Sequence, residues 1–436
     1  MKRKIYDDLV AWKTSGSLKP LMLLGARQVG KTYIIREFCK NEYQKFVEIN
    51  LLSNKDVIEI YNKSEDSEIK LIKLKALLNE NFDDENTILF IDEIQESDNL
   101  IAELKFFNEK HPEIKIICAG SLLGVRLKRS MVSFPVGKVK MLNVYPLDFE
   151  EFLDALNEKE LKRLIEHSFI SDKKMDEILH NKALNLYRYY LCIGGMPEVV
   201  TNFINNNHDV NKVDITIIKD IVQSYYNDMS KYINNNPEAI KIERIYNSIP
   251  TQLANENKKF IFSKIAVGAK KRDYLTALDW LLASNLVLTA NNVKKPEIPL
   301  KATADLDVFK LFLSDVGILT SLLEIQFSNI LLNKISSYIG AITENFVACN
   351  LAAMNKSMYY FQSKDNIEID FIIDTKDGII PIEVKAGINT KSLSLNKYLD
   401  KYHTKYAIRI SAKNFGFVNN IKSVPLYAVY CLKDLL

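Results

Sequence analysis

Residues 20–32 read PLMLLGARQVGKT, and this stretch decides the fold. The apolar run Pro20–Leu24 is typical of a buried parallel strand, and a glycine follows it directly. From Gly25 to Thr32 the residues match the pattern G-x-x-x-x-G-K-[ST] in full, between a predicted strand and a predicted helix. Gly25 and Gly30 permit a tight loop whose backbone N–H groups point at a phosphate, and the start of the next helix favours the same negative charge. The stretch therefore predicts a phosphate-binding loop.

The residue types within this loop indicate a nucleoside triphosphate and a magnesium ion. Lys31 is placed to hold its ammonium against the β- and γ-phosphates, and the hydroxyl of Thr32 is a ligand for Mg²⁺. We therefore predict a nucleoside triphosphate and Mg²⁺ as ligands. A chance glycine-rich turn is the alternative, and the full match in the expected context disfavours it. The residues predicted to surround the nucleotide are Gly25, Ala26, Arg27, Gln28, Val29, Gly30, Lys31, Thr32 and Tyr33.

A second acidic motif, NTILFIDEIQES, supplies the rest of a nucleotide site. Four apolar residues, Ile88–Ile91, lead to Asp92 and Glu93 at the carboxyl end of a predicted strand, where open α/β sheets bind ligands. We predict that Asp92 helps to hold Mg²⁺ with Thr32, and that Glu93 polarises the attacking water as a base or orienter. A solvated turn is the alternative interpretation of this acidic pair.

The next predicted strand, KIICAG, ends at Gly120 and Ser121. A small polar side chain at this position can hydrogen-bond the γ-phosphate or the attacking water, so Ser121 is predicted to couple hydrolysis to movement. A serine after a glycine is equally common in ordinary turns. The basic residues that follow include candidates for a finger that reaches a neighbouring subunit's nucleotide, and the sequence does not choose among them: Arg126, Lys128, Arg129 and Lys138.

Composition places these motifs in an ordinary globular chain. The 436 residues are 47% hydrophobic and 26% charged, which excludes a disordered or fibrous protein. Lys+Arg 58 against Asp+Glu 55 leaves a net charge of +3, so any nucleic-acid surface must be local. The scattered cysteines suit reduced thiols, and no apolar run reaches the length of a membrane span. We expect a cytoplasmic protein with no membrane partner.

The last hundred residues carry a second constellation of charged side chains. Glu344 lies on a predicted helix, Asp370 lies within a predicted strand, and Glu383 and Lys385 project to the same face of the next strand. The order Asp, twelve residues, Glu-x-Lys resembles the PD-(D/E)xK nuclease-like superfamily. That resemblance implies a second metal site at Glu344, Asp370, Glu383 and Lys385, in which water attacks a nucleic acid. A nuclease-like module used only for binding is the alternative. The runs YAIRIS and LYAVYC are predicted to complete the sheet.

Between these ends, residues 239–290 resemble a winged helix. Lys270, Lys271 and Arg272 cluster at the predicted start of its second helix, where a DNA-reading helix carries cations. The alternative is a packing helix with solvated cations.

The motifs GARQVGKT, LFIDEIQ, CAGSLLG, FPVGKVKMLNVYPLDFEEFL and YLCIGGMPEVV together resemble a family of bacterial and archaeal AAA+-type ATPases with a C-terminal domain of unknown function. The resemblance covers nearly the whole chain and implies ATP binding and hydrolysis by Lys31, Thr32, Asp92 and Glu93. Lys138 departs from the arginine that members often carry, so a finger role there is doubtful.

We therefore expect an α/β fold with a parallel, AAA+-like P-loop sheet, helices on both faces, a winged-helix-like module and a restriction-endonuclease-like end. The predicted regions are an ATPase core at 1–148, a helical lid at 149–235, a connector at 236–325 and a nuclease-like domain at 326–436. The predicted function is an ATPase switch or motor acting on a protein, DNA or RNA partner, and a homo-oligomer is expected from AAA+ relatives. The alternatives are an ATP-gated nuclease and a nucleotide-sensing scaffold.

Overall fold

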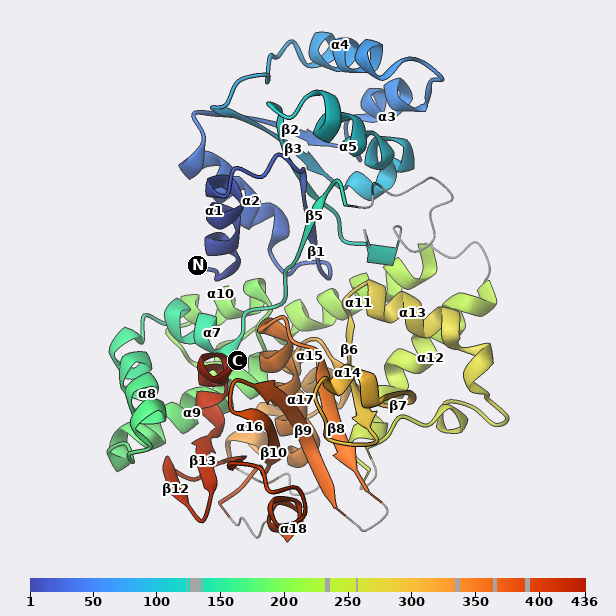
Figure 1. Ribbon diagram of the computed structural model, residues 1–436. Coiled ribbons are helices and arrows are strands. Elements are labelled where there is room, and N and C mark those ends of the chain that lie inside the picture. Colours follow the sequence, from blue (N-terminus) through green and yellow to red (C-terminus); the bar gives the residue numbers. More distant parts are fainter. Residues whose placement is uncertain are drawn as a thin grey trace. The chain divides into compact units, whose positions relative to one another are not determined.

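A computed structural model (Figure 1) gives the arrangement of most of the chain. The described residues are 1–122, 124–125, 135, 137–231, 236–255, 258–332, 334, 338–363, 367–388 and 393–436. They form two compact units. The N-terminal unit comprises Lys2–Tyr145 and Ala283–Asn285, and the C-terminal unit comprises Pro146–Leu282 and Leu286–Leu436, with Met1.

The N-terminal unit alternates strands and helices, as the sequence predicts. Among its described residues, five parallel strands are ordered β2-β3-β4-β1-β5. The predicted parallel sheet is thereby confirmed. The elements are α1 (Ile5–Thr14), β1 (Leu21–Leu24), α2 (Lys31–Glu42), β2 (Lys45–Asn50), α3 (Lys55–Asn62), α4 (Ser67–Leu78), β3 (Thr87–Asp92), the 3-10 turn η1 (Ile94–Glu96), α5 (Asp98–Lys110), β4 (Lys115–Ala119) and β5 (Lys140–Asn143).

Helices cover both faces of this sheet (Figure 1). On one face, alternate strand residues such as Met22, Leu89 and Ile91 pack with α3, α4 and α5 into one apolar core. Helix α1 packs on α2, which contacts β2, β3 and β4. β5 was not predicted from the sequence, because its residues are half-buried or exposed and form no continuous apolar run.

The C-terminal unit holds a second, mixed sheet. Its eight described strands are ordered β12-β13-β11-β10-β9-β8-β6-β7. The strands are β6 (Val287–Val293), β7 (Ala304–Leu313), β8 (Met358–Gln362), β9 (Glu368–Thr375), β10 (Gly378–Val384), β11 (Ala407–Ser411), β12 (Gly416–Val418) and β13 (Ile421–Pro425). β6 and β7 precede the boundary predicted after residue 325, yet they belong to the same sheet as the strands that follow it. The four predicted regions stay a prediction.

Helices surround this sheet (Figure 1). They are α7 (Phe149–Ala155), α8 (Lys159–Ser171), α9 (Glu177–Ile193), α10 (Pro197–Asn205), α11 (Ile215–Lys231), α12 (Asn236–Leu253), α13 (Leu275–Ala283), α14 (Leu300–Thr303), α15 (Val316–Leu322), α16 (Phe327–Leu331), α17 (Ile339–Ala353) and α18 (Leu393–Tyr402). Short 3-10 segments are η2 (Val210–Lys212), η3 (Phe262–Lys264), η4 (Lys271–Asp273) and η5 (Leu426–Leu435). The strand predicted for LYAVYC is wrong, because these residues form the buried 3-10 segment η5 after β13.

The motif YLCIGGMPEVV contains the turn between helices α9 and α10 of the C-terminal unit. At Gly195 a β-carbon would overlap the carbonyl oxygen of Leu147, so only glycine fits. The Gly195 N–H donates to Asp315 over 2.7 Å, and the same carboxylate caps α15 by accepting from the Ile318 N–H at 3.0 Å. Burial raises the pKa of Asp315 to about 6, although backbone N–H donors oppose the shift.

No helix among the described residues is long and apolar enough to cross a lipid bilayer.

Candidate functional site

The predicted phosphate-binding loop lies between the end of β1 and the start of α2. Gly25 adopts φ 152° and Gly30 adopts φ 91°, both in the range that favours glycine. At Gly25 a β-carbon would also overlap the carbonyl oxygen of Val144, which follows β5. The chain passes so close to its neighbour here that glycine is required, and this lets the loop turn sharply into the helix.

The Lys31 side chain lies over its own loop. Its Nζ donates to the carbonyl oxygens of Gly25 at 2.8 Å and Ala26 at 2.7 Å. Only 7% of the residue is exposed, so the ammonium is buried within the loop and close to the position where phosphates are expected. The other predicted loop residues differ in accessibility: Ala26 and Val29 are buried, Arg27 is half-buried, and Gln28 and Tyr33 are exposed.

The structure brings Asp92 next to Thr32, although sixty residues separate them in the chain. The Thr32 hydroxyl donates to Asp92 Oδ2 over 3.2 Å. Burial, with the nearby charge of Glu93, raises the pKa of Asp92. A cation beside a buried carboxylate offsets both effects, and a hydroxyl with a carboxylate is a suitable oxygen set for Mg²⁺. The residues present therefore fit the predicted ion.

Glu93 takes an unusual backbone conformation directly after β3. Its φ of 54° is left-handed, and its N–H donates to Asp92 Oδ1 at 3.0 Å. Its carboxylate accepts a hydrogen bond from the Gln95 side chain in η1. The left-handed turn therefore lies directly where β3 ends at Asp92, next to the predicted magnesium site.

Ser121 follows β4, which lies between β1 and β3 in the sheet. Its hydroxyl is buried and makes no hydrogen bond with any described residue. Buried hydroxyl groups normally have a hydrogen-bond partner, and this one can donate to or accept from a polar group at the end of β4.

Two residues near this site were not identified from the sequence. Asn50, the last residue of β2, is paired with Asp92 in the sheet register, and its Nδ2 lies 3.5 Å from Asp92 Oδ2. The sequence pattern that could have identified Asn50 is a polar residue at the carboxyl end of a strand. Arg3 donates to the carbonyl oxygens of Val29 at 2.9 Å and Tyr145 at 2.6 Å, and only 5% of it is exposed. No local pattern marks Arg3, because its partners are distant in sequence.

Of the residues predicted as finger candidates, the structure describes Lys138. Lys138 forms an ion pair with Glu109 of α5, with Nζ 2.9 Å from the carboxylate. Arg126, Lys128 and Arg129 lie outside the described residues.

In the C-terminal unit, Glu344 lies on α17 and is almost completely buried. Its carboxylate forms ion pairs with two lysines, neither of which was predicted from the sequence to lie at this site. Lys310 Nζ of β7 is 2.9 Å from Oε1, and Lys258 pairs with Oε2. Burial alone would raise the pKa of Glu344, but the two positive charges lower it to about 2.

The other predicted members of this constellation lie on β9 and at the end of β10. Asp370 accepts a hydrogen bond from the Val384 N–H at 2.8 Å, and its Oδ1 lies 3.9 Å from Lys310. Glu383 and Lys385 form an ion pair at 3.2 Å, and Glu383 Oε2 is buried with no partner among the described residues. Across the part of the chain that the structure describes, no group of three or more His, Cys, Asp or Glu residues is arranged to hold a metal ion.

The predicted DNA-reading cations lie before α13 rather than on it, in and next to η4. Lys271 binds Asp307 of β7, and Arg272 lies 3.5 Å from Asp273. Because carboxylates partly neutralise this cluster, it adds little to the case for DNA contact, which stays a prediction.

Comparisons with known proteins agree with the geometry of the N-terminal unit. The family described as "AAA domain" matches residues 17–153. Two domains of unknown function match further along, DUF8612 at residues 184–329 and DUF4143 at residues 339–429. A search of curated proteins finds no match.

Among solved structures, a Walker-type ATPase of Pyrococcus abyssi is similar with a TM-score of 0.43 and 15% identity, over 74% of this chain and 95% of that one. The ORC2 protein of Aeropyrum pernix, in complexes with ADPNP and ADP, gives a TM-score of 0.36 and 14% identity, over 76% and 93%. Cdc6p of Pyrobaculum aerophilum gives 0.27 and 12%, over 76% and 94%.

The loop geometry and the family match together show that the N-terminal part of this chain is an AAA-type P-loop ATPase domain. The two matches beyond it name no activity.

Proposed function

We propose that this protein is a Mg²⁺-dependent ATPase that works as a switch or motor on a protein or nucleic-acid partner. One observation carries the proposal. Lys31, Asp92 and Ser121 follow or end three adjacent strands, β1, β3 and β4, and therefore meet at one edge of the sheet. Each has the chemistry that one part of ATP hydrolysis needs, and the hydroxyl of Ser121 has no described partner.

Binding begins at the loop. The triphosphate lies against the backbone N–H groups between Gly25 and the start of α2, where the helix dipole favours negative charge. Lys31 leaves the carbonyl oxygens of Gly25 and Ala26 and turns its ammonium to the β- and γ-phosphates. The half-buried Arg27 and exposed Tyr33 frame the loop where the rest of the nucleotide is expected.

Thr32 and Asp92 are the residues that would hold Mg²⁺. When bound, the ion neutralises charge on the phosphate oxygens. Glu93, which follows Asp92 directly, accepts a proton from the attacking water or orients that water toward the γ-phosphate. Its pairing with Gln95 fixes the carboxylate in the absence of ATP.

Ser121 reports whether a γ-phosphate is present. A hydroxyl that is unsatisfied without ATP gains a hydrogen bond when the phosphate or the water arrives, and loses it after hydrolysis. Such a change at the end of β4 is a local event from which movement of a partner-binding surface can follow. The partner is a protein, DNA or RNA, and a homo-oligomer in the cytoplasm is the form we expect.

The test separates binding from hydrolysis. Lys31→Ala should abolish thermal stabilisation by Mg²⁺-ATP, which for wild type amounts to about 2.7 kcal/mol at a hundredfold excess over the dissociation constant. Lys40→Ala, on the exposed side of α2, is the matched control and should behave as wild type. Glu93→Gln should bind ATP normally but hydrolyse it at least about a hundredfold more slowly, whereas exposed Glu59→Gln should not.

The proposal fails if wild-type protein shows no ATP-dependent stabilisation. It also fails if Lys31→Ala retains the full effect, because the loop would then not be the binding site. Binding without turnover by wild type, with or without added DNA, RNA or lysate protein, would favour the nucleotide-sensing scaffold instead.

A further inference from the structure

The ammonium group of Lys310 lies among three carboxylates of the C-terminal unit. Its Nζ is 2.9 Å from Glu344, 3.8 Å from Glu368 and 3.9 Å from Asp370. Only 1% of the lysine is exposed, and its Nζ also lies 4.9 Å from the centre of the Tyr360 ring. A buried point charge surrounded by carboxylates is the arrangement that a cation site requires, and here a side chain supplies the cation.

A second lysine completes the neutralisation. Lys258 binds the other carboxylate oxygen of Glu344, so both oxygens of Glu344 have a lysine partner. Burial alone would lower the pKa of Lys258, but Glu344 and Asp370 raise it, and it stays charged. Two lysines therefore face the buried carboxylate of Glu344 and the partly buried carboxylate of Asp370, and the positive charge that Mg²⁺ would bring is already present.

The carboxylate oxygens at this position also supply too few ligands for the ion, because among the described oxygens of Glu344, Asp370 and Glu383 it is Glu383 Oε2 that is buried without a partner. Mg²⁺ requires oxygen ligands about 2.0–2.1 Å away and keeps several waters. Glu344 has both oxygens bound to lysines, and one oxygen of Asp370 accepts the Val384 N–H. Directly after β10, the predicted site residue Lys385 is paired with Glu383 of that strand. The residues present thus do not fit the metal centre that the nuclease-like pattern implies.

We propose that Lys258 and Lys310 stand in for the metal ion, so that the C-terminal unit keeps its acidic cluster as a metal-independent core and cleaves no phosphodiester bonds. The cluster ties together elements that are distant in sequence: the segment before η3, strand β7, helix α17 and strand β9. Its role is to hold these elements in place as a binding module, and any nucleic acid that binds the unit is left intact.

Mn²⁺ alone is the probe for this inference, counted by electron paramagnetic resonance on the full chain without nucleotide. All proteins carry Asp92→Asn, which removes a ligand of the other predicted divalent site. The parent should bind no Mn²⁺ and show no shift in melting temperature. The double variant Lys258→Met/Lys310→Met leaves Glu344 and Asp370 without their counter-charges, so it should melt at a lower temperature and bind one Mn²⁺ per chain, which restores part of the loss.

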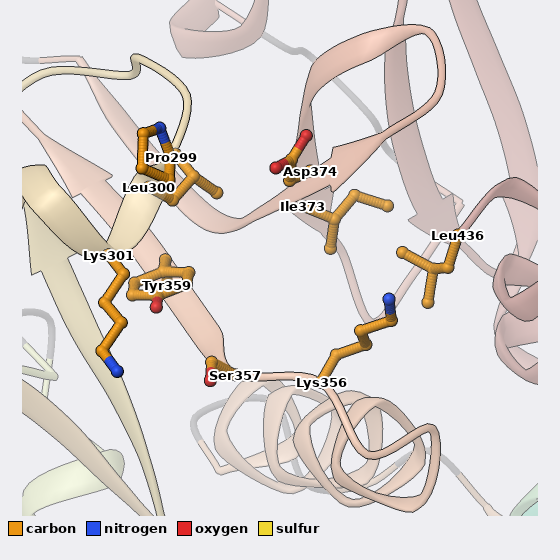
Figure 2. A pocket seen from close by; sticks show the side chains of 9 residues that line it. All are labelled: Pro299, Leu300, Lys301, Lys356, Ser357, Tyr359, Ile373, Asp374 and Leu436. Carbon is orange, nitrogen blue, oxygen red and sulfur yellow. The ribbon is translucent and has the colours of Figure 1, made fainter.

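A matched control removes two lysines that the cluster does not use. Lys301 and Lys356 are exposed and line a separate pocket with Ser357 and Asp374 (Figure 2). Lys301→Met/Lys356→Met should bind no Mn²⁺ and should melt close to the parent. A gain of Mn²⁺ binding in this control would show that the ion responds to overall charge and would overturn the assignment.

The parent protein decides the question even if the double variant does not fold. Mn²⁺ binding by the parent that Asp370→Asn abolishes would overturn the proposal, and so would Mn²⁺-dependent nicking of plasmid DNA that Asp370→Asn abolishes. A folded double variant that binds no Mn²⁺ would also overturn it, because the lysines would then not occupy a metal position. None of these outcomes depends on whether the chain hydrolyses ATP.

Discussion

Arg3 offers a direct test of how the predicted phosphate-binding loop is held. Its guanidinium donates to the carbonyl oxygens of Val29, within the loop, and Tyr145, beyond β5. Arg3→Met keeps an apolar stem but removes both donors. A buried acceptor left unpaired costs about 1–3 kcal/mol, so two such oxygens should lower the free energy of unfolding by about 4 kcal/mol.

Half of this loss concerns the loop itself, because one of the two carbonyls belongs to Val29. If about 2 kcal/mol of loop order is lost, the fraction of molecules with a binding-competent loop falls, and the dissociation constant of ATP should rise about thirtyfold. Arg3→Lys carries the charge without the fork of donors and should give an intermediate effect.

The measurement is ATP titration by calorimetry, together with urea unfolding of the same samples. Lys2→Met is the matched control, because Lys2 is exposed next to Arg3 and should affect neither quantity. The reasoning is refuted if Arg3→Met lowers the unfolding free energy while ATP affinity stays within about twofold of wild type. Arg3 would then stabilise the unit without positioning the loop.

Three further outcomes follow from single positions. Gly25→Ala should destabilise the N-terminal unit by about 2–4 kcal/mol and abolish ATP binding, whereas Gly416→Ala, with open space around it, should be near neutral by urea unfolding. Gly195→Ala should give little soluble protein, since its β-carbon meets a backbone oxygen; recovery at wild-type yield and melting temperature would contradict this. The pKa of Asp315 is higher in the folded chain than in the unfolded chain, so Asp315 contributes fully to the free energy of unfolding below about pH 4. About 3 kcal/mol of that contribution is lost as the pH rises through 6. Asp315→Asn should therefore lack this pH dependence in urea unfolding from about pH 4 to 7, and parallel pH curves for wild type and variant would refute the reasoning.

The core of the candidate nucleotide site could be predicted because its signals are local. The strand, the glycines and Lys31 are contiguous, and Asp92 follows an apolar run that reads as a buried strand. Parallel strands place such residues at one edge without any knowledge of strand order. The same argument places Ser121 at this edge, and its role stays a prediction.

The remaining features depend on partners that no local pattern specifies. The contact of Arg3 with the loop could not be predicted from the sequence, because its acceptors are backbone carbonyl oxygens, which every residue carries. Strand β5 lacks an apolar run. The apolar run LYAVYC resembles a buried strand, and its residues are buried, but they lie in the 3-10 segment η5. In the C-terminal unit the acidic residues were predicted as a set, but their charges are balanced by Lys258 and Lys310, which come from a different part of the chain.

The loop contains an internal competitor for phosphate, because the Lys31 ammonium is hydrogen-bonded to the carbonyl oxygens of Gly25 and Ala26. If the loop binds a nucleotide as proposed, binding is an exchange reaction, in which these two hydrogen bonds are broken and contacts with phosphate are formed. The affinity then reflects the difference between the two sets of contacts. A nucleotide whose phosphates do not reach Lys31 would leave both internal hydrogen bonds intact.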